Sequence, residues 1–384
     1  MTGPGGTLAA PGLARPRDSG EVAALLAESR RVAPVGGGTK LAWGAPGDAP
    51  DLLLSTEGLG AIVEHNAGDL TVILEAGVTL RGAQEQFAGV GQRLALDPPD
   101  GDGRATVGGI LATADSGPLR HRYGAVRDLI LGVRVALPDG TVARAGSNVI
   151  KNVAGYDLAK LMCGALGTLG VICEATLRLH PLPEQSITVW GSATDPGVLA
   201  RAARLLAGRA LELEALDLRW DGPAAGGCLL ARAVGRAAAS TAGTVAALMG
   251  EAGLEVDPVH EDDAELWAEQ RARQRALPDG AVVRVSALPA DLERVLGACE
   301  SAVGRAALGL AWVRLDGEDA AGVERLRAAL APAPCVVLDA PEALRRAVDP
   351  WGVVEGPELD LLRRVKARFD PTGVCNPGRF AGGI

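Results

Sequence analysis

The chain has 384 residues, of which 48% are hydrophobic, so two domains with separate cores are expected. Its net charge is −9, with 38 Lys and Arg residues against 47 Asp and Glu residues, which leaves no excess of cations to bind a nucleic-acid backbone. The most basic short run, at 363–368, falls in a helical pattern and is interpreted as a solvated helix face.

Six cysteines are spread along the chain without a Cys-x-x-Cys pair, so the sequence offers no local zinc or iron–sulfur motif. The first residues lack a basic segment followed by an apolar core, and no uninterrupted apolar stretch of about 18 residues follows. We therefore expect free thiols, no membrane span and a cytoplasmic location, with peripheral attachment to the inner membrane through partner subunits left open.

The first half of the chain alternates helical and extended patterns. Asp18 or Ser19 can cap a first helix, and a strand at 32–35 runs into the glycine loop 36–40. Several strands are apolar on both faces, which predicts a sheet covered on both sides. The other elements expected here are strands at 51–55, 61–65, 71–75, 128–137 and 141–144, a helix from Thr79 to Phe87, and a strand from Val171.

A boundary is expected at 180–183, because Pro181 and Pro183 remove backbone donors and should stop the preceding strand. The pattern beyond it suits an antiparallel sheet with helices on one face. The elements expected there are strands at 215–220, 228–234, 281–286, 308–315 and 334–338, a long polar helix at 262–276, and a last helix at 357–369.

The first candidate binding motif is the glycine loop Gly36-Gly37-Gly38-Thr39-Lys40, which follows a strand. Residues without side chains let consecutive backbone N–H groups point into one concavity, an arrangement that binds a diphosphate. The loop has neither the Gly-x-Gly-x-x-Gly fingerprint nor the Gly-Lys-Ser/Thr of a P-loop. Because the chain contains 52 glycines, a plain turn is the alternative interpretation.

The second motif spans 97–124 and contains Thr106-Val107-Gly108-Gly109 and Ser116-Gly117. Thr106 is predicted to cap a helix whose bare N-terminus would suit an anionic or electron-rich ligand. Taken alone, the segment is explained equally well as a tightly packed helix start.

The third motif spans 148–172 and includes Lys-Asn-Val-Ala-Gly-Tyr-Asp-Leu at 151–158. Together, in this order and spacing, the three motifs resemble the vanillyl-alcohol-oxidase (PCMH) type of FAD-binding domain, and in particular the FAD-binding subunits of bacterial glycolate oxidase. The ending Phe-Asp-Pro at 369–371 with Asn-Pro-Gly-Arg at 376–379 is similar to the same family. The resemblance covers 18–182 and the C-terminal segment, and is loose over 185–350.

The resemblance implies an α+β fold, in which a two-part PCMH-type FAD-binding domain (1–184) is followed by a smaller antiparallel α+β cap domain (185–350) and a C-terminal segment (351–384) that returns to the flavin. It also implies that the glycine loop binds the FAD diphosphate through backbone N–H groups. For Tyr156, Asp157 and Lys160 a structural role is an equal alternative. The residues implied to bind FAD are Gly36, Gly37, Gly38, Thr39, Lys40, Pro98, Thr106, Gly108, Gly109, Ser116, Gly117, Tyr123, Gly170, Ile172 and Asn376.

Two positions depart from the family pattern: Asp115 stands where relatives often have Asn, and Ala165 where many have Ser. A side-chain hydrogen bond to FAD is expected to be absent at each. Some members tether the flavin to a His in the glycine loop or to a nearby Cys, but none of the four histidines lies in this loop. Noncovalent FAD is therefore expected.

Flavin-dependent oxidation of a 2-hydroxy acid needs a hydride acceptor, a base for the hydroxyl proton and a cation for the carboxylate. His121 is the candidate base, with an exposed loop histidine as the alternative interpretation. Arg271 and Arg284 are candidate cations, and Trp267 is a candidate neighbour of the flavin. The histidine-rich metal motif of related catalytic chains is missing, so no metal site is expected, and His260 is interpreted as part of a solvated helix start.

The resemblance implies an FAD-dependent oxidoreductase acting on CH–OH groups, as the FAD-binding subunit of a glycolate or D-lactate oxidase or dehydrogenase complex. The implied partners are a metal-bearing flavin subunit and an iron–sulfur subunit, with a small 2-hydroxy acid as substrate. Two alternatives stay open: a non-catalytic FAD-binding scaffold, and an NADPH-dependent reductase on the same domain. The Asn-Pro-Gly-Arg ending argues against the reductase.

Overall fold

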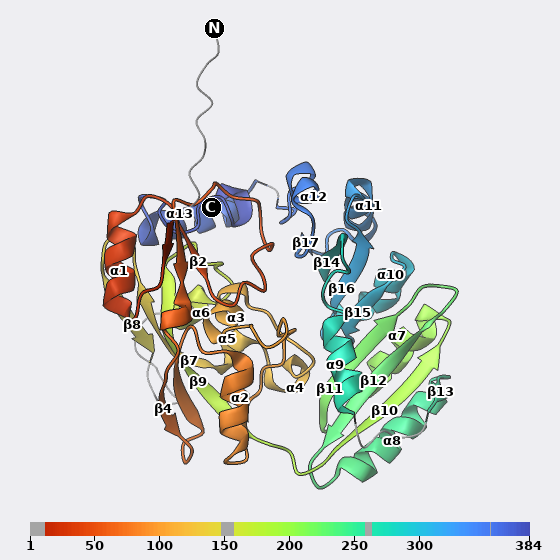
Figure 1. Ribbon diagram of the computed structural model, residues 1–384. Helices are drawn as coiled ribbons and strands as arrows, with labels where there is room; N and C mark the ends of the chain where they lie inside the picture. The colour runs from red at the N-terminus through yellow and green to blue at the C-terminus, as the bar shows by residue number, and fades with distance from the viewer. Residues whose placement is uncertain (1–11, 147–156, 258–262, 354) are drawn as a thin grey trace.

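The computed structural model describes residues 12–146, 157–257, 263–353 and 355–384. Figure 1 shows two lobes that meet along a seam, one built from β1 to β9 with α13 beside them and the other from β10 to β17. We call them the FAD lobe and the cap lobe, in keeping with the domains that the sequence predicts. The chain crosses between them after β9 (Val171–Pro181) and before β10 (Ser186–Ala193), and the exact domain bounds stay a prediction.

A small parallel sheet forms one part of the FAD lobe. Its order is β1 (Gly12–Ala14), β3 (Leu52–Ser55) and β2 (Val32–Val35). Helix α1 (Ser19–Glu28) packs against it and is capped by the predicted Asp18, whose carboxylate accepts from the N–H groups of Gly20 and Glu21. The C-terminal segment returns to the same sheet, where Asn376 N donates to Val32 O at 2.8 Å.

A larger antiparallel sheet forms the other part, in the order β4-β5-β9-β7-β8, with β6 paired to the end of β9. Its core contains Phe87 of α2 and Ile110 and Leu111 of α3. The bounds are β4 (Ile62–Asn66), β5 (Thr71–Glu75), α2 (Leu80–Ala88), β6 (Gln92–Leu94), α3 (Val107–Thr113), α4 (Arg120–Tyr123), α5 (Val126–Leu129), β7 (Ile130–Ala136), β8 (Val142–Gly146) and α6 (Leu158–Met162), with one 3-10 turn (Thr56–Gly58).

Several boundaries differ from the sequence predictions, among them the helix expected at 262–276, which spans Ala264–Ala272, and two in the FAD lobe have a clear structural reason. The strand expected to stop before Pro181 includes that residue, because its end pairs with β6, where Gln92 lies opposite Pro181. The strand expected from residue 128 begins at Ile130, because Val126–Leu129 form α5, in which the Asp128 carboxylate accepts from Ala125 N.

The cap lobe is an eight-stranded antiparallel sheet in the order β13-β10-β12-β11-β15-β16-β14-β17. Its further strands are β11 (Leu213–Trp220), β12 (Gly227–Val234), β13 (Glu255–Val256), β14 (Gly280–Ser286), β15 (Ala302–Arg305), β16 (Leu310–Asp316) and β17 (Cys335–Val337). The predicted α+β fold class with an antiparallel second unit is confirmed.

Helices α7 (Pro196–Ala207), α8 (Ala238–Glu251), α10 (Leu292–Gly297) and α11 (Ala320–Leu330) share one core with a face of this sheet. Helix α9 (Ala264–Ala272) differs from the prediction of helices on one face. Its Trp267 packs in a separate cluster with Ala215, Cys228 and Leu230, on the side that faces the FAD lobe (Figure 1). Short α12 (Glu342–Ala347) and the predicted α13 (Pro357–Phe369) complete the chain, with 3-10 turns at Pro289–Asp291 and Ala381–Gly383. No helix among the described residues is long and apolar enough to cross a membrane.

Candidate functional site

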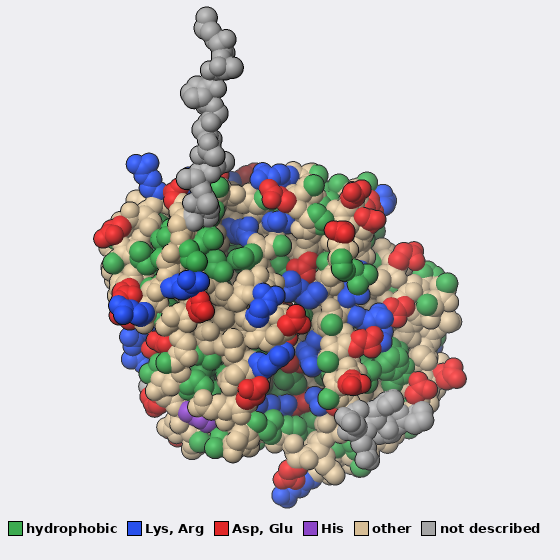
Figure 2. Space-filling model, in the orientation of Figure 1, with side chains coloured by type: hydrophobic (Ala, Val, Ile, Leu, Met, Phe, Trp, Pro, Cys, Tyr) green, Lys and Arg blue, Asp and Glu red, His purple; other side chains and the backbone are tan. Residues whose placement is uncertain are grey.

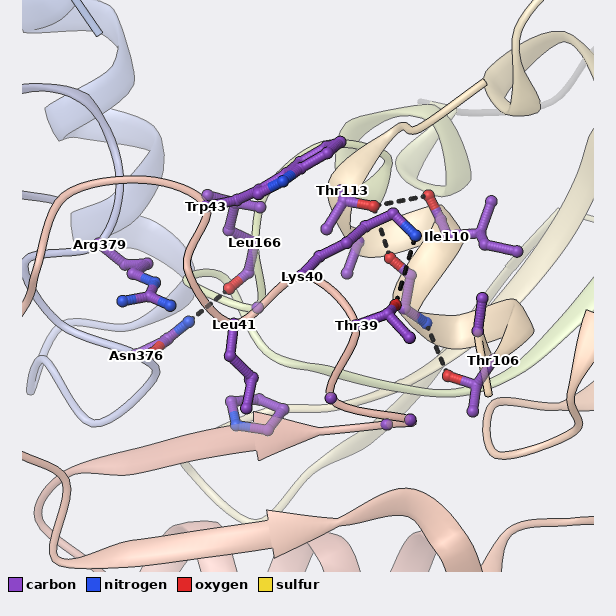
Figure 3. A pocket seen from close by; sticks show the side chains of 18 residues that line it. Thr39, Lys40, Leu41, Trp43, Thr106, Ile110, Thr113, Leu166, Asn376 and Arg379 are labelled. Carbon is purple, nitrogen blue, oxygen red and sulfur yellow. Dashed lines mark hydrogen bonds between the residues drawn. The ribbon is translucent and has the colours of Figure 1, made fainter. Parts of the chain in front are cut away.

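The glycine loop and α3 border a cavity of about 610 Å³ (Figure 3). A second cavity of about 480 Å³ adjoins it and shares Pro34, Gly36, Gly109, Ala112 and Gly167 with the first. Together they form one recess, which reaches from Trp43 and Arg379 at one end to Gly170 and Ile172 at the other. We call it the cofactor recess.

The glycine loop packs directly against the second motif. A Cβ at Gly36 would collide with the Thr106 hydroxyl, and one at Gly37 would collide with the carbonyl of Arg104. Gly38 has φ +73°, a left-handed conformation that favours glycine, and a Cβ there would make only an ordinary contact with Leu41. The first two glycines are thus required by the packing of two protein segments, and only the third by backbone conformation.

Thr106 is the N-cap of α3, as the sequence predicts. Its backbone is extended, and its hydroxyl accepts from Gly109 N at 3.2 Å. Gly108 packs on Ala76, where a Cβ would collide with the backbone carbonyl, while Gly109 lines both parts of the recess.

Lys40 and Asp115 form a buried ion pair beside the recess. Lys40 Nζ lies 3.2 Å from Asp115 Oδ2, and the two side chains are only 5% and 3% exposed. The other carboxylate oxygen of Asp115 accepts from Ser116 N at 2.9 Å. The aspartate that replaces the family's Asn at position 115 is therefore paired with a lysine of the glycine loop.

The lining of the recess suits an anionic cofactor that also has a flat apolar ring system. No acidic side chain lines it among the described residues, whereas Arg379 and Lys40 both do. Burial lowers the pKa of Arg379, and the neighbouring Arg345 lowers it further. A guanidinium in such surroundings favours a bound anion, and Pro34, Trp43 and Leu166 supply apolar walls.

The C-terminal segment is fixed to one wall of the recess. Asn376 adopts φ +44°, and its side-chain amide donates to Leu166 O at 2.7 Å (Figure 3). Lys366 Nζ donates to Thr168 O at 2.7 Å and to the Asp370 carboxylate at 2.6 Å, while that carboxylate accepts from Cys375 N. Asn376 thus reaches the recess as predicted, with its amide N–H group directed to protein.

Eleven of the predicted FAD-binding residues line the recess: Gly36, Gly37, Gly38, Thr39, Lys40, Thr106, Gly108, Gly109, Gly170, Ile172 and Asn376. The structure places the other four elsewhere. Pro98 lines a groove of about 1320 Å³ on the seam between the lobes. Ser116 and Gly117 lie at the contact with the cap lobe, where Ser116 O accepts from Gln274. Tyr123 donates through its hydroxyl to Glu214 at 3.0 Å and packs against the His180 ring.

The three candidate catalytic residues are not gathered in one place. Arg271 lines the groove on the seam between the lobes, and its Nη1 lies 3.9 Å from Asp97 Oδ2. Figure 2 shows several Lys and Arg side chains along this seam. Arg284, on β14, is close enough to Asp115 for that carboxylate to raise its pKa, although burial dominates and lowers it. Its Nε is buried without a hydrogen-bond partner in the described part of the chain.

His121 lies on α4 and is half-buried. Burial lowers the pKa of its imidazole, and Arg122 lowers it further. Its Nδ1 is buried and has no hydrogen-bond partner among the described residues. The ring is neutral at neutral pH and can accept a proton, and its partial burial argues against the alternative of an exposed loop histidine.

The sequence interpretation missed two residues near this site. Arg120 precedes His121, and its pKa is lowered by burial and further by the charge of Arg284. Burial raises the pKa of Asp97 to about 7, against the opposing effect of Arg271 and Arg305. The only signals in the sequence were the Leu-Arg-His-Arg-Tyr run at 119–123 and the Asp-Pro-Pro run at 97–99.

Part of the third motif, 148–156, and His260 lie outside the described residues. Asp157 caps α6, and Lys160 Nζ lies 3.1 Å from its carboxylate, so these two residues contact each other. In the described ranges, no group of three His, Cys, Asp or Glu residues could hold a metal ion. None of the described histidines lines the recess, and burial raises the pKa of the Cys163 thiol to about 12. Noncovalent attachment of FAD stays a prediction.

Comparison with known proteins supports the cofactor directly. Residues 10–146 match the model of the family described as FAD binding domain. The chain is 39% identical to D-lactate dehydrogenase of Archaeoglobus fulgidus over 171 residues. These aligned residues are 44% of this chain and 38% of that protein. It is 38% identical over 128 residues to glycolate oxidase subunit GlcE of Escherichia coli, covering 33% of this chain and 37% of the relative. The predicted resemblance and FAD as the cofactor are confirmed.

The chain spans well under half the length of these relatives. A mitochondrial D-lactate dehydrogenase (cytochrome) of Arabidopsis thaliana is 34% identical over 176 residues, which are 45% of this chain and 30% of that one. The fold extends further than the sequence similarity. A solved structure of alkyldihydroxyacetonephosphate synthase superposes with a TM-score of 0.70 at 16% identity, over 95% of this chain and 75% of the other.

Proposed function

Residues 10–146 match the family of FAD binding domains, and from this premise we propose that the chain is the flavin-carrying subunit of an oxidoreductase that acts on the CH–OH group of a 2-hydroxy acid. Relatives named D-lactate dehydrogenase and glycolate oxidase subunit support this substrate class. When bound, FAD supplies the acceptor for the hydride that such an oxidation releases. The protein residues must then supply a cation for the carboxylate and a base for the hydroxyl proton.

One observation carries the proposal: Arg120 and Arg284 are both partly buried, the charge of Arg284 lowers the pKa of Arg120, and neither side chain forms a salt bridge among the described residues. Arg120 Nη1 donates to the Ser116 hydroxyl at 3.3 Å, and the Arg284 Nε has no hydrogen-bond partner in the described ranges. Like charges repel each other, and burial increases the cost of leaving them unpaired. The carboxylate of a hydroxy acid would offset both effects through charge-assisted hydrogen bonds.

His121 is the residue that we propose to take the hydroxyl proton. It follows Arg120 on α4, and its lowered pKa keeps the ring neutral at neutral pH. Lys40 is not a candidate for binding the substrate carboxylate, because Asp115 neutralises its charge. The backbone of Lys40 and of the other residues of the glycine loop would contact the cofactor diphosphate.

We further propose that the chain works in a complex with a metal-bearing flavin subunit and an iron–sulfur subunit, located in the cytoplasm. The names of two relatives support a complex, since both are called subunits of glycolate oxidase. The described residues include no cluster of cysteines that could carry electrons onward, so a partner would have to receive them. A non-catalytic FAD scaffold and an NADPH-dependent reductase are the alternatives.

Binding of a substrate analogue tests the proposed cation pair without turnover. Oxalate is expected to change the absorbance spectrum of the FAD-loaded protein in a saturable way, and Arg284→Gln is expected to weaken its affinity by about tenfold or more, the effect of losing one charge-assisted contact. Arg294→Gln is the matched control, because Arg294 binds the carbonyls of Ala329 and Ala331 within the cap lobe. Equal oxalate affinity in both variants would contradict the assignment.

A further inference from the structure

Two consecutive residues of the cap lobe bind the backbone of the glycine loop and of the segment that follows α3. Gln274 Nε2 donates to Ser116 O, in the second motif, at 3.0 Å. Arg275 Nη2 donates to Thr39 O, in the glycine loop, at 2.9 Å. Both residues follow the end of α9, the helix on the face of the cap sheet that is directed toward the FAD lobe.

Gln274 is rigidly supported from the cap sheet. It is 2% exposed, and its side-chain oxygen accepts from the guanidinium of Arg305. Arg305 is itself fully buried on β15, where Nη1 donates to Asp217 at 2.6 Å. The contact to Ser116 therefore ends a buried polar chain that begins on two strands of the cap sheet.

Arg275 is supported by a carboxylate that both lobes share. Its Nε and Nη2 donate to the two oxygens of Asp339 at 2.5 and 2.8 Å. Asp339 also accepts from the indole Nε1 of Trp43 at 2.7 Å, and Trp43 lines the cofactor recess. The planar guanidinium thus binds Asp339 and Thr39 at once, which an ammonium on a flexible stem cannot reproduce.

These contacts determine the direction of backbone N–H groups. In a trans peptide the C=O and the following N–H point to opposite sides. Because Arg275 binds Thr39 O from the cap lobe, the N–H of Lys40 points away from the cap lobe. Because Gln274 binds Ser116 O, the N–H of Gly117 does the same. Within the described ranges, neither N–H donates to a protein group. Thr39 and Lys40 line the recess.

We propose that Gln274 and Arg275 act as a clamp that positions the glycine loop and the segment that follows α3, so that docking of the cap lobe and binding of FAD strengthen each other. A coupling of this kind is reciprocal: whatever the clamp adds to FAD affinity, FAD adds to the stability of the docked cap lobe. The clamp residues are positioning residues, and the inference concerns FAD binding alone, so it does not depend on the proposed hydroxy acid.

The test compares Arg275→Lys with wild type in a titration of the full-length apoprotein with FAD, followed by quenching of flavin fluorescence. Lysine keeps the charge but loses the fork, so the Kd for FAD is expected to rise about tenfold, the usual effect of one charge-assisted hydrogen bond. Arg294→Lys is the matched control, because it changes an arginine that binds carbonyl groups far from the loops, and its Kd should equal that of wild type.

A second measurement keeps the inference testable if the variant does not fold. Hydrogen exchange in the wild-type protein at 273–276 is expected to slow when FAD is added, while exchange at the end of α11, near Ala329, should be unaffected. An unchanged Kd in Arg275→Lys would overturn the clamp. So would exchange at 273–276 that is insensitive to FAD.

Discussion

The buried pair of Lys40 and Asp115 makes a quantitative prediction. In Asp115→Asn the Lys40 ammonium stays 5% exposed and loses the carboxylate 3.2 Å away. Removing one partner of a buried ion pair leaves an uncompensated charge and costs about 3 to 5 kcal/mol of folding stability. Arg284 also loses the one carboxylate that favours its charge, which adds to the cost.

The assay is urea unfolding of the apoprotein, followed through the FAD lobe. Asp115→Asn should lower the free energy of unfolding by at least about 3 kcal/mol, whereas Glu342→Gln, which breaks the exposed pair with Arg346, should change it by less than about 1 kcal/mol. Lys40→Met combined with Asp115→Asn should recover much of the loss, because no buried charge is left. A single Asp115→Asn variant as stable as Glu342→Gln would refute the reasoning.

Three other predictions follow from the site. Gly37→Ala should abolish FAD binding, because the new Cβ collides with the carbonyl of Arg104. The control Gly60→Ala, where a Cβ makes an ordinary contact, should still bind FAD. The measurement is the flavin content after gel filtration, and a normal flavin content in Gly37→Ala would contradict the loop packing. Burial gives Asp97 a pKa of about 7 in the folded protein against an ordinary 3.8, so the fold disfavours its charged form. As the pH rises from about 4 to 7, wild type should therefore lose stability relative to Asp97→Asn. Urea unfolding midpoints of the two proteins that change in parallel with pH would show that the carboxyl is not perturbed. Acid precipitation should leave the flavin in the supernatant, and yellow protein in the pellet would show a covalent link.

The sequence was sufficient for features that depend on local patterns. The glycine loop after a strand, the cap at Thr106 and the helix at Pro357–Phe369 follow from short-range turn, capping and periodicity rules, and the structure confirms them. The ordered motifs together were sufficient for the cofactor, which the family comparison confirms.

Pairs that join distant parts of the chain could not be predicted in the same way. Arg275 and Thr39 are 236 residues apart, and nothing in the residues around either one indicates the other. The sequence also contained no sign that the missing side chain of Gly37 serves the contact with Arg104. Arg120 could not be distinguished from a solvated arginine until the fold packed α4 against β11 of the cap lobe and partly buried this side chain.

The central claim is that this chain carries the flavin that oxidises a 2-hydroxy acid. The most direct measurement is anaerobic mixing of the FAD-loaded chain, purified together with the proteins that accompany it in its native host, with glycolate or D-lactate while flavin absorbance is followed. The account predicts that one of these acids bleaches the flavin of this chain and that Arg284→Gln slows the bleaching. A flavin that no hydroxy acid reduces in that assembly, or that only NADPH reduces, would contradict it.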